Sequence, residues 1–381
     1  MPAATSDAFL QGQGIPVDPN QIEAELTRLW GPAAERVGGP EVENPTVTRI
    51  VLANLVVGTH IADAARVDEV VDTVVERYPC RVIVLRQTDE AERKISAEIS
   101  ALCHLPAPGM PQVCSERIAL RAGPQALDLL PGAVRSLLEA DLPFVLWWTH
   151  DPRESEGLFL DLGDECSRLI LDLPDPEADP EAVRVGLNLE KIPYARDIAW
   201  FGVSRWRELV AHFFDGPRCK ETLTRIASVE IRAQAPSLAH TPRVSAWLAA
   251  WLAGQLGWQP ESRRTPAPGR TEATFRGPSG SITVTTLTES DPTAQFACLT
   301  GVTLTTRGPD GETTRRVERP TCDAQEVRIE VESPRACALP RLVHAPTFDA
   351  ARRVHAALES SRDDPPFRRA LPHVLWILGG S

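Results

Sequence analysis

The residues TVTRIVLANLVVGTHIADAARVDEVVDTVVERYPCRVIVL, numbered 46–85, decide the fold class of this chain. The first twelve, 46–57, are rich in β-branched side chains and predict a buried strand. Valines at helical spacing predict a helix over residues 61–77, which Pro79 ends. RVIVL, residues 81–85, predicts the next strand.

Downstream, two runs with partial alternation of apolar and polar residues lie at 94–105 and 112–121. A Pro/Gly loop joins them, so they predict a β-hairpin. A helix near 125–140 leads to the most apolar strand, 142–148, and RLILDL at 168–173 is a further strand. Because short strands alternate with helices, the first half is expected to be α/β, with a partly parallel, doubly wound sheet.

Upstream, residues 1–17 have the composition of a polar tail. The GQG of residues 12–14 precedes any predicted strand and lacks a third glycine, so it indicates a flexible tail and not a dinucleotide-binding turn. Asp18 and Pro19 are suited to the N-cap and first position of a helix. Four apolar residues then share one face, and the helix is expected to end near Gly31: Ile22, Leu26, Leu29 and Trp30.

The second half is mixed. After the Pro-rich stretch 174–182, helices are expected from residue 204 and from residue 241, the second ending at Gly257. A Pro/Gly/Arg linker is expected at 261–270, followed by antiparallel strands with GPSG and GPDG turns and by two final helices. The predicted domains are a flexible N-terminal tail (1–20), an α/β domain (21–175), a helical connecting segment (176–260) and a smaller α+β C-terminal domain (261–381).

Composition excludes several classes of protein. Among 381 residues, 40 are Lys or Arg and 52 are Asp or Glu, which gives a net charge of −12. An acidic chain is not expected to bind nucleic acid or an anionic membrane surface. No signal peptide or membrane-spanning stretch is recognisable, so a cytoplasmic location with reduced cysteines is expected.

The sequence carries no motif that indicates catalysis. It has no phosphate-binding loop, GxSxG elbow, HExxH motif, CxxC pair or zinc-ligand spacing, so no catalytic, cofactor or metal residue is predicted. His60 follows the first strand, where α/β folds place ligand groups, but a lone histidine there is more often a cap or a packed residue. His104 and His150 are interpreted in the same way.

Two cysteines stand out from the eight. Cys103 and Cys114 flank the predicted hairpin loop and could face each other across it. A disulfide would need their Cα atoms within about 7 Å, which makes them a candidate redox pair. The alternative, two buried reduced thiols, is the more common arrangement and is favoured, as it is for Cys80.

Tryptophan and arginine clusters are the strongest physical signal. Neighbouring Trp147 and Trp148 end a strand, so one of them must face a helix layer or a partner if the other packs in the core. Both residue types are enriched at protein interfaces. Core packing for the tryptophans and a solvated face for the arginines remain the simpler interpretations. The candidate partner interface is Trp148, Trp200, Arg205, Trp206 and Arg207.

The order and spacing of several segments resemble a known family. The chain is similar to the OpcA family, the glucose-6-phosphate dehydrogenase assembly proteins of bacteria, over most of residues 20–260 and more faintly beyond. The segments that carry the resemblance are IEAELTRLW (22–30), YPCRVIVLR (78–86), VCSERIALR (113–121), LPFVLWW (142–148), RLILDL (168–173) and DIAWFGVSRWRELVAHFFD (197–215).

The resemblance implies a non-catalytic protein that binds glucose-6-phosphate dehydrogenase and promotes its active oligomer. It also implies a use for exposed Trp and Arg side chains, so Trp206→Ala with Arg207→Ala is expected to weaken dehydrogenase binding. In photosynthetic bacteria the family is linked to thioredoxin, which would give Cys103 and Cys114 a redox role. The alternative is a sugar-phosphate-binding enzyme or metabolite sensor that uses the α/β crevice, but the glycine-rich turn or basic cluster it requires is not found.

Overall fold

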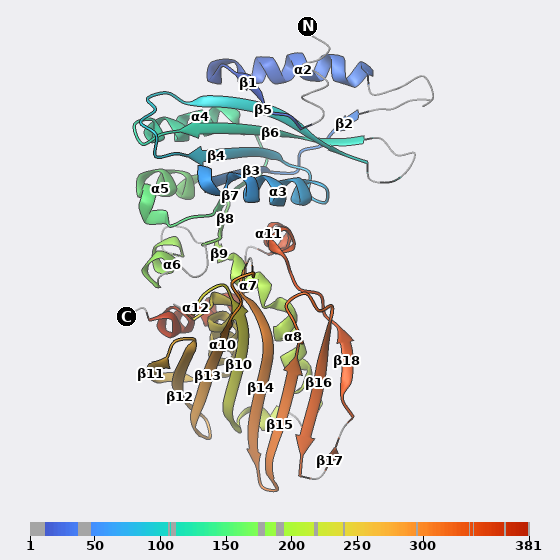
Figure 1. The fold of residues 1–381 in the computed structure, drawn as a ribbon, viewed down its shortest axis with the longest axis vertical. Coiled ribbons are helices and arrows are strands. Elements are labelled where there is room, and N and C mark those ends of the chain that lie inside the picture. The colour runs from blue at the N-terminus through green and yellow to red at the C-terminus, as the bar shows by residue number, and fades with distance from the viewer. Residues whose placement is uncertain are drawn as a thin grey trace. The chain divides into compact units, whose positions relative to one another are not determined.

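A computed structural model describes residues 12–36, 47–105, 107, 112–173, 180–187, 194–216, 220–238, 241–294, 296–334, 336–337, 339–361 and 363–379. The chain forms two compact units, whose elements are labelled in Figure 1. The α/β unit contains Met1–Asp172, Gly186–Arg196 and Ala350–Ser360. The second, here called the β-sheet unit, contains Leu173–Val185, Asp197–Asp349 and Ser361–Ser381.

The α/β unit is built on a sheet with the order β1-β5-β6-β4-β3-β7-β8-β9, and β2 pairs with β6. Strands β6, β4, β3, β7 and β8 run parallel, while β5 is antiparallel to β6 and β1 to β5. The predicted doubly wound sheet and the predicted hairpin are confirmed. The strands are β1 (Ile15–Val17), β2 (Val47–Arg49), β3 (Asn54–His60), β4 (Arg81–Gln87), β5 (Ser96–His104), β6 (Gln112–Ala122), β7 (Phe144–Trp148), β8 (Arg168–Leu171) and β9 (Ala195–Asp197).

The helices of this unit follow the predicted apolar stripes. All five valines at positions 67, 70, 71, 74 and 75 are buried in α3. The segment predicted as one strand at 46–57 is in fact two strands, and the first helix continues past Gly31 to Arg36. The helices are η1 (Pro19–Gln21), α2 (Ile22–Arg36), η2 (Ile61–Asp63), α3 (Ala64–Val75), η3 (Leu127–Leu129), α4 (Leu130–Leu137), η4 (Pro152–Ser155), α5 (Glu156–Glu165) and α11 (Ala350–Glu359). A further short helix, α6 (Pro180–Gly186), spans the division between the two units.

One helix of the α/β unit comes from far along the chain. Helix α11 packs against α3, and the ring of His355 lies edge-on to that of Tyr78 at 6.5 Å. Arg168 of β8 donates hydrogen bonds to the carbonyl oxygens of Ala357, Leu358 and Ser360. The α/β unit is therefore completed by residues 350–360.

The β-sheet unit has the strand order β11-β12-β13-β10-β14-β15-β16-β17, with β18 also paired to β16. All pairs are antiparallel except β10 with β13. The predicted GPSG and GPDG hairpins form, and each ends on a glycine with positive φ, Gly280 and Gly311. The strands are β10 (Ile226–Ala235), β11 (Gln259–Ala267), β12 (Arg270–Gly277), β13 (Gly280–Ser290), β14 (Cys298–Gly308), β15 (Gly311–Glu318), β16 (Glu326–Ser333), β17 (Ala336–Cys337) and β18 (Arg341–His344).

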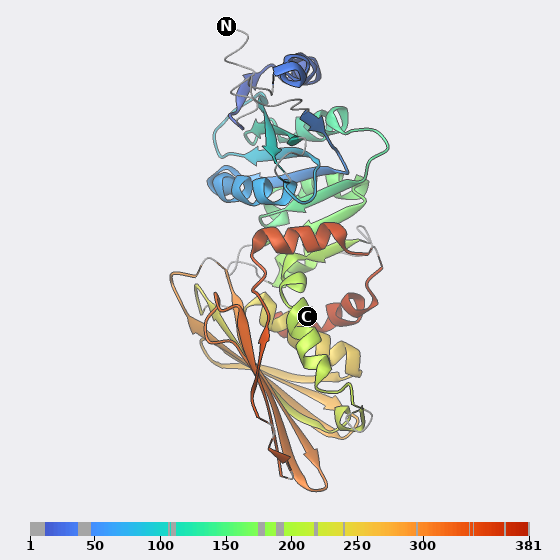
Figure 2. The same ribbon diagram turned by 90° about the vertical axis from the view of Figure 1, so that its right-hand side faces the viewer.

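The helices of this unit lie against one face of its sheet (Figure 2). Helix α10 is buried on nearly all sides and ends at Gly257, whose φ of 66° confirms the predicted glycine C-cap. Gly254 lets α12 approach closely, because a Cβ there would lie 2.4 Å from the carbonyl oxygen of Arg369. The helices are α7 (Ile198–Gly202), α8 (Ser204–His212), α9 (Lys220–Leu223), α10 (Arg243–Leu256) and α12 (Pro365–Leu378).

Two predictions for the second half are wrong. The segment 176–260, predicted to be helical, contains β10, which lies in the middle of the second sheet. The predicted linker 261–270 is mostly β11, an edge strand whose residues are all exposed. Proline is tolerated on an edge strand, so its Pro260 and Pro266 do not prevent pairing. Among the described residues, no helix is both long and apolar enough to cross a membrane.

Candidate functional site

The structure buries the tryptophans of the predicted partner interface. Trp148, Trp200 and Trp206 are each no more than 2% exposed. Trp148 ends β7, an internal strand covered on both faces, and its ring packs against Phe159 of α5 at 5.2 Å. These three side chains are core residues, which was the simpler interpretation of the sequence. They therefore offer no surface to a partner.

Trp200 lies at the centre of an aromatic cluster in the β-sheet unit. Its ring contacts Trp247 of α10 and Phe367 of α12 edge-on, and its Nε1 donates to the carboxylate of Asp364 at 2.8 Å. The guanidinium carbon of Arg207 lies 3.6 Å from the centre of the Trp200 ring. Burial lowers the pKa of Arg207 to about 10, against the opposing influence of Asp364 and Glu208. Arg207 thus packs over the Trp200 ring and is only partly exposed, which differs from the fully solvated position expected for it.

Arg205, another of the predicted interface residues, lies at the surface. Its side chain is 34% exposed, pairs with Glu208 at 2.7 Å and donates to the carbonyl oxygen of His344. Of the five candidates, Arg205 and Arg207 are partly exposed and only Arg205 has an exposed ion-pair partner. The predicted residues therefore do not form one surface.

A buried ion pair that sequence reasoning missed holds α7 to α10. The carboxylate of Asp197 is fully buried, accepts from the backbone N–H of Ala199 as an N-cap and binds Arg243 at 2.7 Å. Its second oxygen accepts from Nε1 of Trp247 at 2.8 Å. The available signal was an aspartate directly before the apolar run 198–201, which is an N-cap pattern.

A second missed cluster brings together three of the segments that carry the family resemblance. Glu116 of β6 is 1% exposed and accepts from Arg81 of β4, Arg49 of β2 and Nε1 of Trp30. Arg81 also forms ion pairs with Glu23, in the first turn of α2, and with Glu139 at 3.2 Å. Burial alone would raise the pKa of Glu139, but Arg49 and Arg81 lower it overall. This network joins strands and helix into one body, and Glu23 also lines a cleft of about 990 Å³.

Cys103 and Cys114 face each other in the β5–β6 hairpin and form a disulfide, with their Cα atoms 4.1 Å apart. This differs from the reduced pair that the sequence favoured. Cys103 also lines a cavity of about 300 Å³ together with Asp72, Glu76 and His104. Burial raises the pKa of Asp72, opposed by the charge of Arg117. The Cys103 side of this disulfide therefore borders a cavity.

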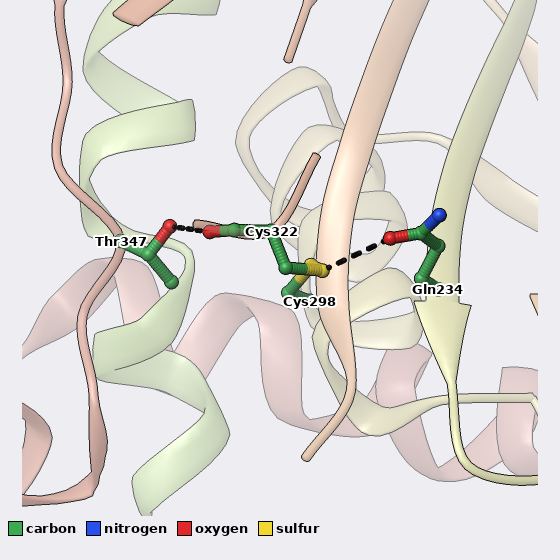
Figure 3. The surroundings of a disulfide bond; sticks show 4 residues. All are labelled: Gln234, Cys298, Cys322 and Thr347. Atoms are coloured by element: carbon green, nitrogen blue, oxygen red, sulfur yellow. Dashed lines mark hydrogen bonds between the residues drawn. A yellow bond between two sulfur atoms is a disulfide. The ribbon is translucent and has the colours of Figure 1, made fainter. Parts of the chain in front are cut away.

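A second disulfide, which the sequence did not suggest, joins Cys298 of β14 to Cys322 in the β15–β16 connection (Figure 3). The side-chain oxygen of Gln234 lies 3.4 Å from the Cys322 sulfur, and Thr347 donates to the Cys322 carbonyl oxygen. The two cysteines are 24 residues apart and lie at the open end of the β14–β15 hairpin, whose last register pair is Gly301 with Glu318. The predicted GPDG hairpin was therefore the local signal for this pairing. Cys80 is a buried free thiol, and burial raises its pKa to about 12.

The crevice of the doubly wound sheet lies at the carboxyl ends of β3 and β7, where the strand order reverses. A dinucleotide would need a glycine-rich turn and a free helix N-terminus there. Instead, a Cβ at Gly58 would lie 2.3 Å from the Trp148 ring, and the His60 side chain caps the following helical turn. These residues do not fit a dinucleotide phosphate.

His150 also lies in this crevice and is buried. Its Nε2 lies 3.1 Å from the side-chain nitrogen of Gln87 and 3.4 Å from the hydroxyl of Ser155. Burial and the nearby His60 lower the pKa of His150 to about 4, so it is neutral at pH 7. The side chain of His60, which is 30% exposed, lies 3.6 Å from Asp89. The three histidines singled out by the sequence do not converge, since His104 belongs to the cavity beside Cys103.

Comparison with known proteins gives two matches that together span most of the chain. Residues 71–185 match the glucose-6-phosphate dehydrogenase subunit N-terminal domain of the OpcA assembly family, and residues 193–371 match its C-terminal domain. Curated relatives named "Putative OxPP cycle protein OpcA" include one from Synechococcus elongatus, 30% identical over 197 residues, and one from Nostoc punctiforme, 31% identical over 201 residues. Each alignment covers 51% of this chain and, respectively, 43% and 41% of the relative.

Solved structures resemble the chain more distantly. A 3-ketoreductase from Actinomadura kijaniata is 12% identical with a TM-score of 0.48, covering 85% of this chain and 94% of that one. A biliverdin reductase from Synechocystis is 10% identical with a TM-score of 0.41, covering 86% and 96%. Likenesses this low give no information on function. The two domain matches do identify the family: the chain belongs to the OpcA family of glucose-6-phosphate dehydrogenase assembly proteins.

Proposed function

We propose that this protein is a non-catalytic activator that binds glucose-6-phosphate dehydrogenase in the cytoplasm and promotes its active oligomer or conformation. The observation that carries the proposal is the match of both halves of the chain, residues 71–185 and 193–371, to the two domains of the assembly family. The partner is the dehydrogenase, and neither nucleic acid nor a membrane is part of the proposal.

The filling of the α/β crevice supports a binding role over catalysis. The indole of Trp148 lies against Gly58, and His60 caps the helical turn that would receive a phosphate. Gln87 and His150 contact each other across the same region. Because the chain's own side chains occupy these positions, the alternative of a sugar-phosphate enzyme or sensor is less well supported.

An activator of this kind works through differential affinity. It must bind the active form of the dehydrogenase more tightly than the inactive form. Each tenfold preference shifts the equilibrium by about 1.4 kcal/mol. Activation should therefore saturate with the concentration of this chain.

The test is the activity of the cognate dehydrogenase across substrate concentrations, with and without the purified full chain. A saturable rise in activity together with co-elution would support the proposal. A fall in KM would indicate conformational activation, and a rise in kcat alone would indicate recovery of inactive enzyme. Absence of both activation and co-elution would reject the proposal and return the crevice to consideration as a ligand site.

Arg205 offers a test of where the dehydrogenase docks. It is the predicted interface residue that retains a surface ion pair, with Glu208. Arg205→Glu should weaken co-elution of this chain with the dehydrogenase. Arg184→Glu is the control and should not, although it also breaks an exposed ion pair with a glutamate three residues away in sequence. Equal affinity of the two variants would remove Arg205 from the interface.

We also propose that the Cys103–Cys114 disulfide regulates this activity. A reduced dithiol protein would attack one sulfur, form a mixed disulfide and leave two thiols here and a disulfide on itself. The 300 Å³ cavity beside Cys103 supports such access. Cys103→Ser with Cys114→Ser should make dehydrogenase activation insensitive to dithiol treatment, whereas Cys298→Ser with Cys322→Ser should leave the sensitivity intact. An unchanged free-thiol count in the native protein after dithiol treatment would reject the redox role.

A further inference from the structure

One face of the sheet in the β-sheet unit carries no helix among the described residues. Helices α8, α10 and α12 lie on the opposite face, as the edge-on view of Figure 2 shows. The alternation of burial along the strands agrees with this: in β10, Val229, Ile231 and Ala233 are buried, while the residues between them are half-buried. The uncovered side is here called the open face.

The strand register arranges the open face in three rows of side chains. The first row is made of hydroxyl residues, and the other two combine charged residues with threonine, leucine and glycine. The first row is Thr274, Thr283, Ser228, Thr305 and Thr314, followed by Glu332. The second is Arg264, Glu272, Thr285, Glu230, Thr303, Arg316 and Glu330. The third is Arg270, Leu287, Arg232, Gly301, Glu318, Arg328 and Leu342.

The charges of the open face cancel although the chain is strongly acidic. The three rows hold five arginines and five glutamates, while the whole chain has a net charge of −12. Arg232 bridges Glu230 and Glu318 at 3.4 and 2.7 Å, and Arg316 binds Glu330 at 3.3 Å. Two copies of a protein with a uniformly acidic face would repel each other, whereas a balanced face can meet its own copy with Arg opposite Glu.

The open face is also large enough for a stable contact. Eight strands about 4.8 Å apart and three rows about 6.6 Å apart cover roughly 34 by 20 Å, or about 700 Å² on each partner. A standard interface buries about 800 Å² on each side. The hydroxyl row, made mostly of threonines with one serine, gives one side of this face short side chains that a partner can approach closely. Leu342, which is 69% exposed on β18, lies at its edge.

We propose that the open face binds the same face of a second copy of this chain, forming a two-fold symmetric dimer in which two sheets pack face to face. The two-fold symmetry requires a self-complementary surface, and the balanced rows provide one. The proposal concerns self-association and does not depend on the identity of the dehydrogenase partner.

The experiment is sedimentation velocity of the full chain over a range of micromolar concentrations. The wild type should sediment as a dimer, at twice the chain mass of 41.7 kDa. Arg232→Glu with Arg316→Glu makes both faces acidic, so its dimer dissociation constant should rise by about 100-fold or more. The matched control, Arg28→Glu with Arg184→Glu, makes the same charge change at two exposed pairs outside the open face and should remain dimeric.

A second variant keeps the test decisive if the charge reversal prevents folding. Thr305→Arg adds a long side chain at the middle of the hydroxyl row and should also yield a monomer, while Thr73→Arg, on the exposed side of α3, should not. A monomeric wild type, or a dimer that survives both open-face variants in folded form, would overturn the proposal. If the wild type is a monomer and these variants no longer bind the dehydrogenase, the open face is the docking site of the dehydrogenase. That result would also overturn the proposal.

Discussion

Glu116 is a buried residue of the α/β unit on which three hydrogen-bond donors converge. Its carboxylate accepts hydrogen bonds from Arg81, Arg49 and Trp30, three residues that are 35, 67 and 86 positions away in sequence. Removing one partner of a buried ion pair leaves the other charge uncompensated, which costs more than the pair contributes. The network therefore makes the sheet dependent on one carboxylate.

Glu116→Gln should lower the free energy of unfolding by about 3 kcal/mol or more, because Arg81 then stays buried with less compensation. The measurement is urea-induced unfolding at pH 7. Glu165→Gln removes an exposed pair with Arg135 and is the control, expected to change stability by less than about 1 kcal/mol. A Glu116→Gln protein as stable as the control would contradict this role.

His150 predicts a pH dependence of stability. Burial lowers its pKa to about 4 in the folded protein, whereas the unfolded chain has a histidine pKa of about 6.5. Between these values the unfolded state binds a proton that the folded state does not. Stability should therefore fall as the pH decreases from about 6.5 to 4, by roughly 3 kcal/mol from this residue.

The difference in unfolding free energy between pH 7 and pH 4 measures this effect. His150→Gln should reduce that difference by roughly 3 kcal/mol. His212→Gln, at an exposed histidine paired with Asp215, is the matched histidine-to-glutamine control. Parallel pH curves for wild type and His150→Gln would show that the buried ring does not stay neutral.

At the scale of elements, the contact of β3 with β7 depends on the absence of one side chain. A Cβ at Gly58 would lie 2.3 Å from the fully buried indole of Trp148. Gly58→Ala should therefore displace the indole and destabilise the protein by about 1–3 kcal/mol. Thermal unfolding and tryptophan fluorescence measure the two effects.

Gly157 provides the matched control, since a Cβ there meets nothing within 4 Å and the residue lies in α5. Gly157→Ala should leave the fluorescence unchanged and stabilise the protein by up to about 1 kcal/mol. If Gly58→Ala behaves like Gly157→Ala, the strands are not held together through this contact.

Elements with a clear local pattern could be predicted from the sequence. The β5–β6 hairpin follows from alternation on both sides of a Pro/Gly loop, and it places Cys103 opposite Cys114. Strand β10 alternates equally well but lies in a segment flanked by helices, and its partners β13 and β14 come later in the chain. Strand β11 was missed because its Pro-rich, exposed residues resemble a linker, and only pairing with β12 makes it a strand.

The candidate site was less predictable than the fold. Tryptophan is a residue type typical of interfaces. The burial of Trp200 and Trp206, however, depends on α10, α12 and Arg319, which are distant in sequence. Trp206→Ala with Arg207→Ala would accordingly disturb the core, so a loss of dehydrogenase binding by that variant would not identify an interface. The Glu116 network likewise arises from non-local contacts.

For the whole molecule, net charge predicts how self-association responds to salt. Two copies with a charge of −12 each repel at long range, while the open faces are neutral. Salt screens the long-range repulsion, with a Debye length of about 10 Å at 0.1 M. The dimer dissociation constant should therefore decrease as sodium chloride is raised at pH 7. Sedimentation equilibrium measures it. A dimer that loosens with salt would contradict this expectation, because the Arg–Glu contacts between the two open faces would then outweigh the long-range repulsion.

The packing of α11 on α3 has a consequence for biosynthesis. The strands of the α/β unit have been translated once the ribosome reaches about residue 196. The helix that packs on α3 is translated only at residues 350–360. At about 5–20 residues per second, the intervening stretch takes roughly 10–30 s to translate. During that interval the nascent α/β unit lacks α11 and its contacts to Tyr78 and Arg168. A nascent chain stalled before residue 350 should therefore be captured by chaperones more readily than one stalled after the α11 segment has left the ribosome.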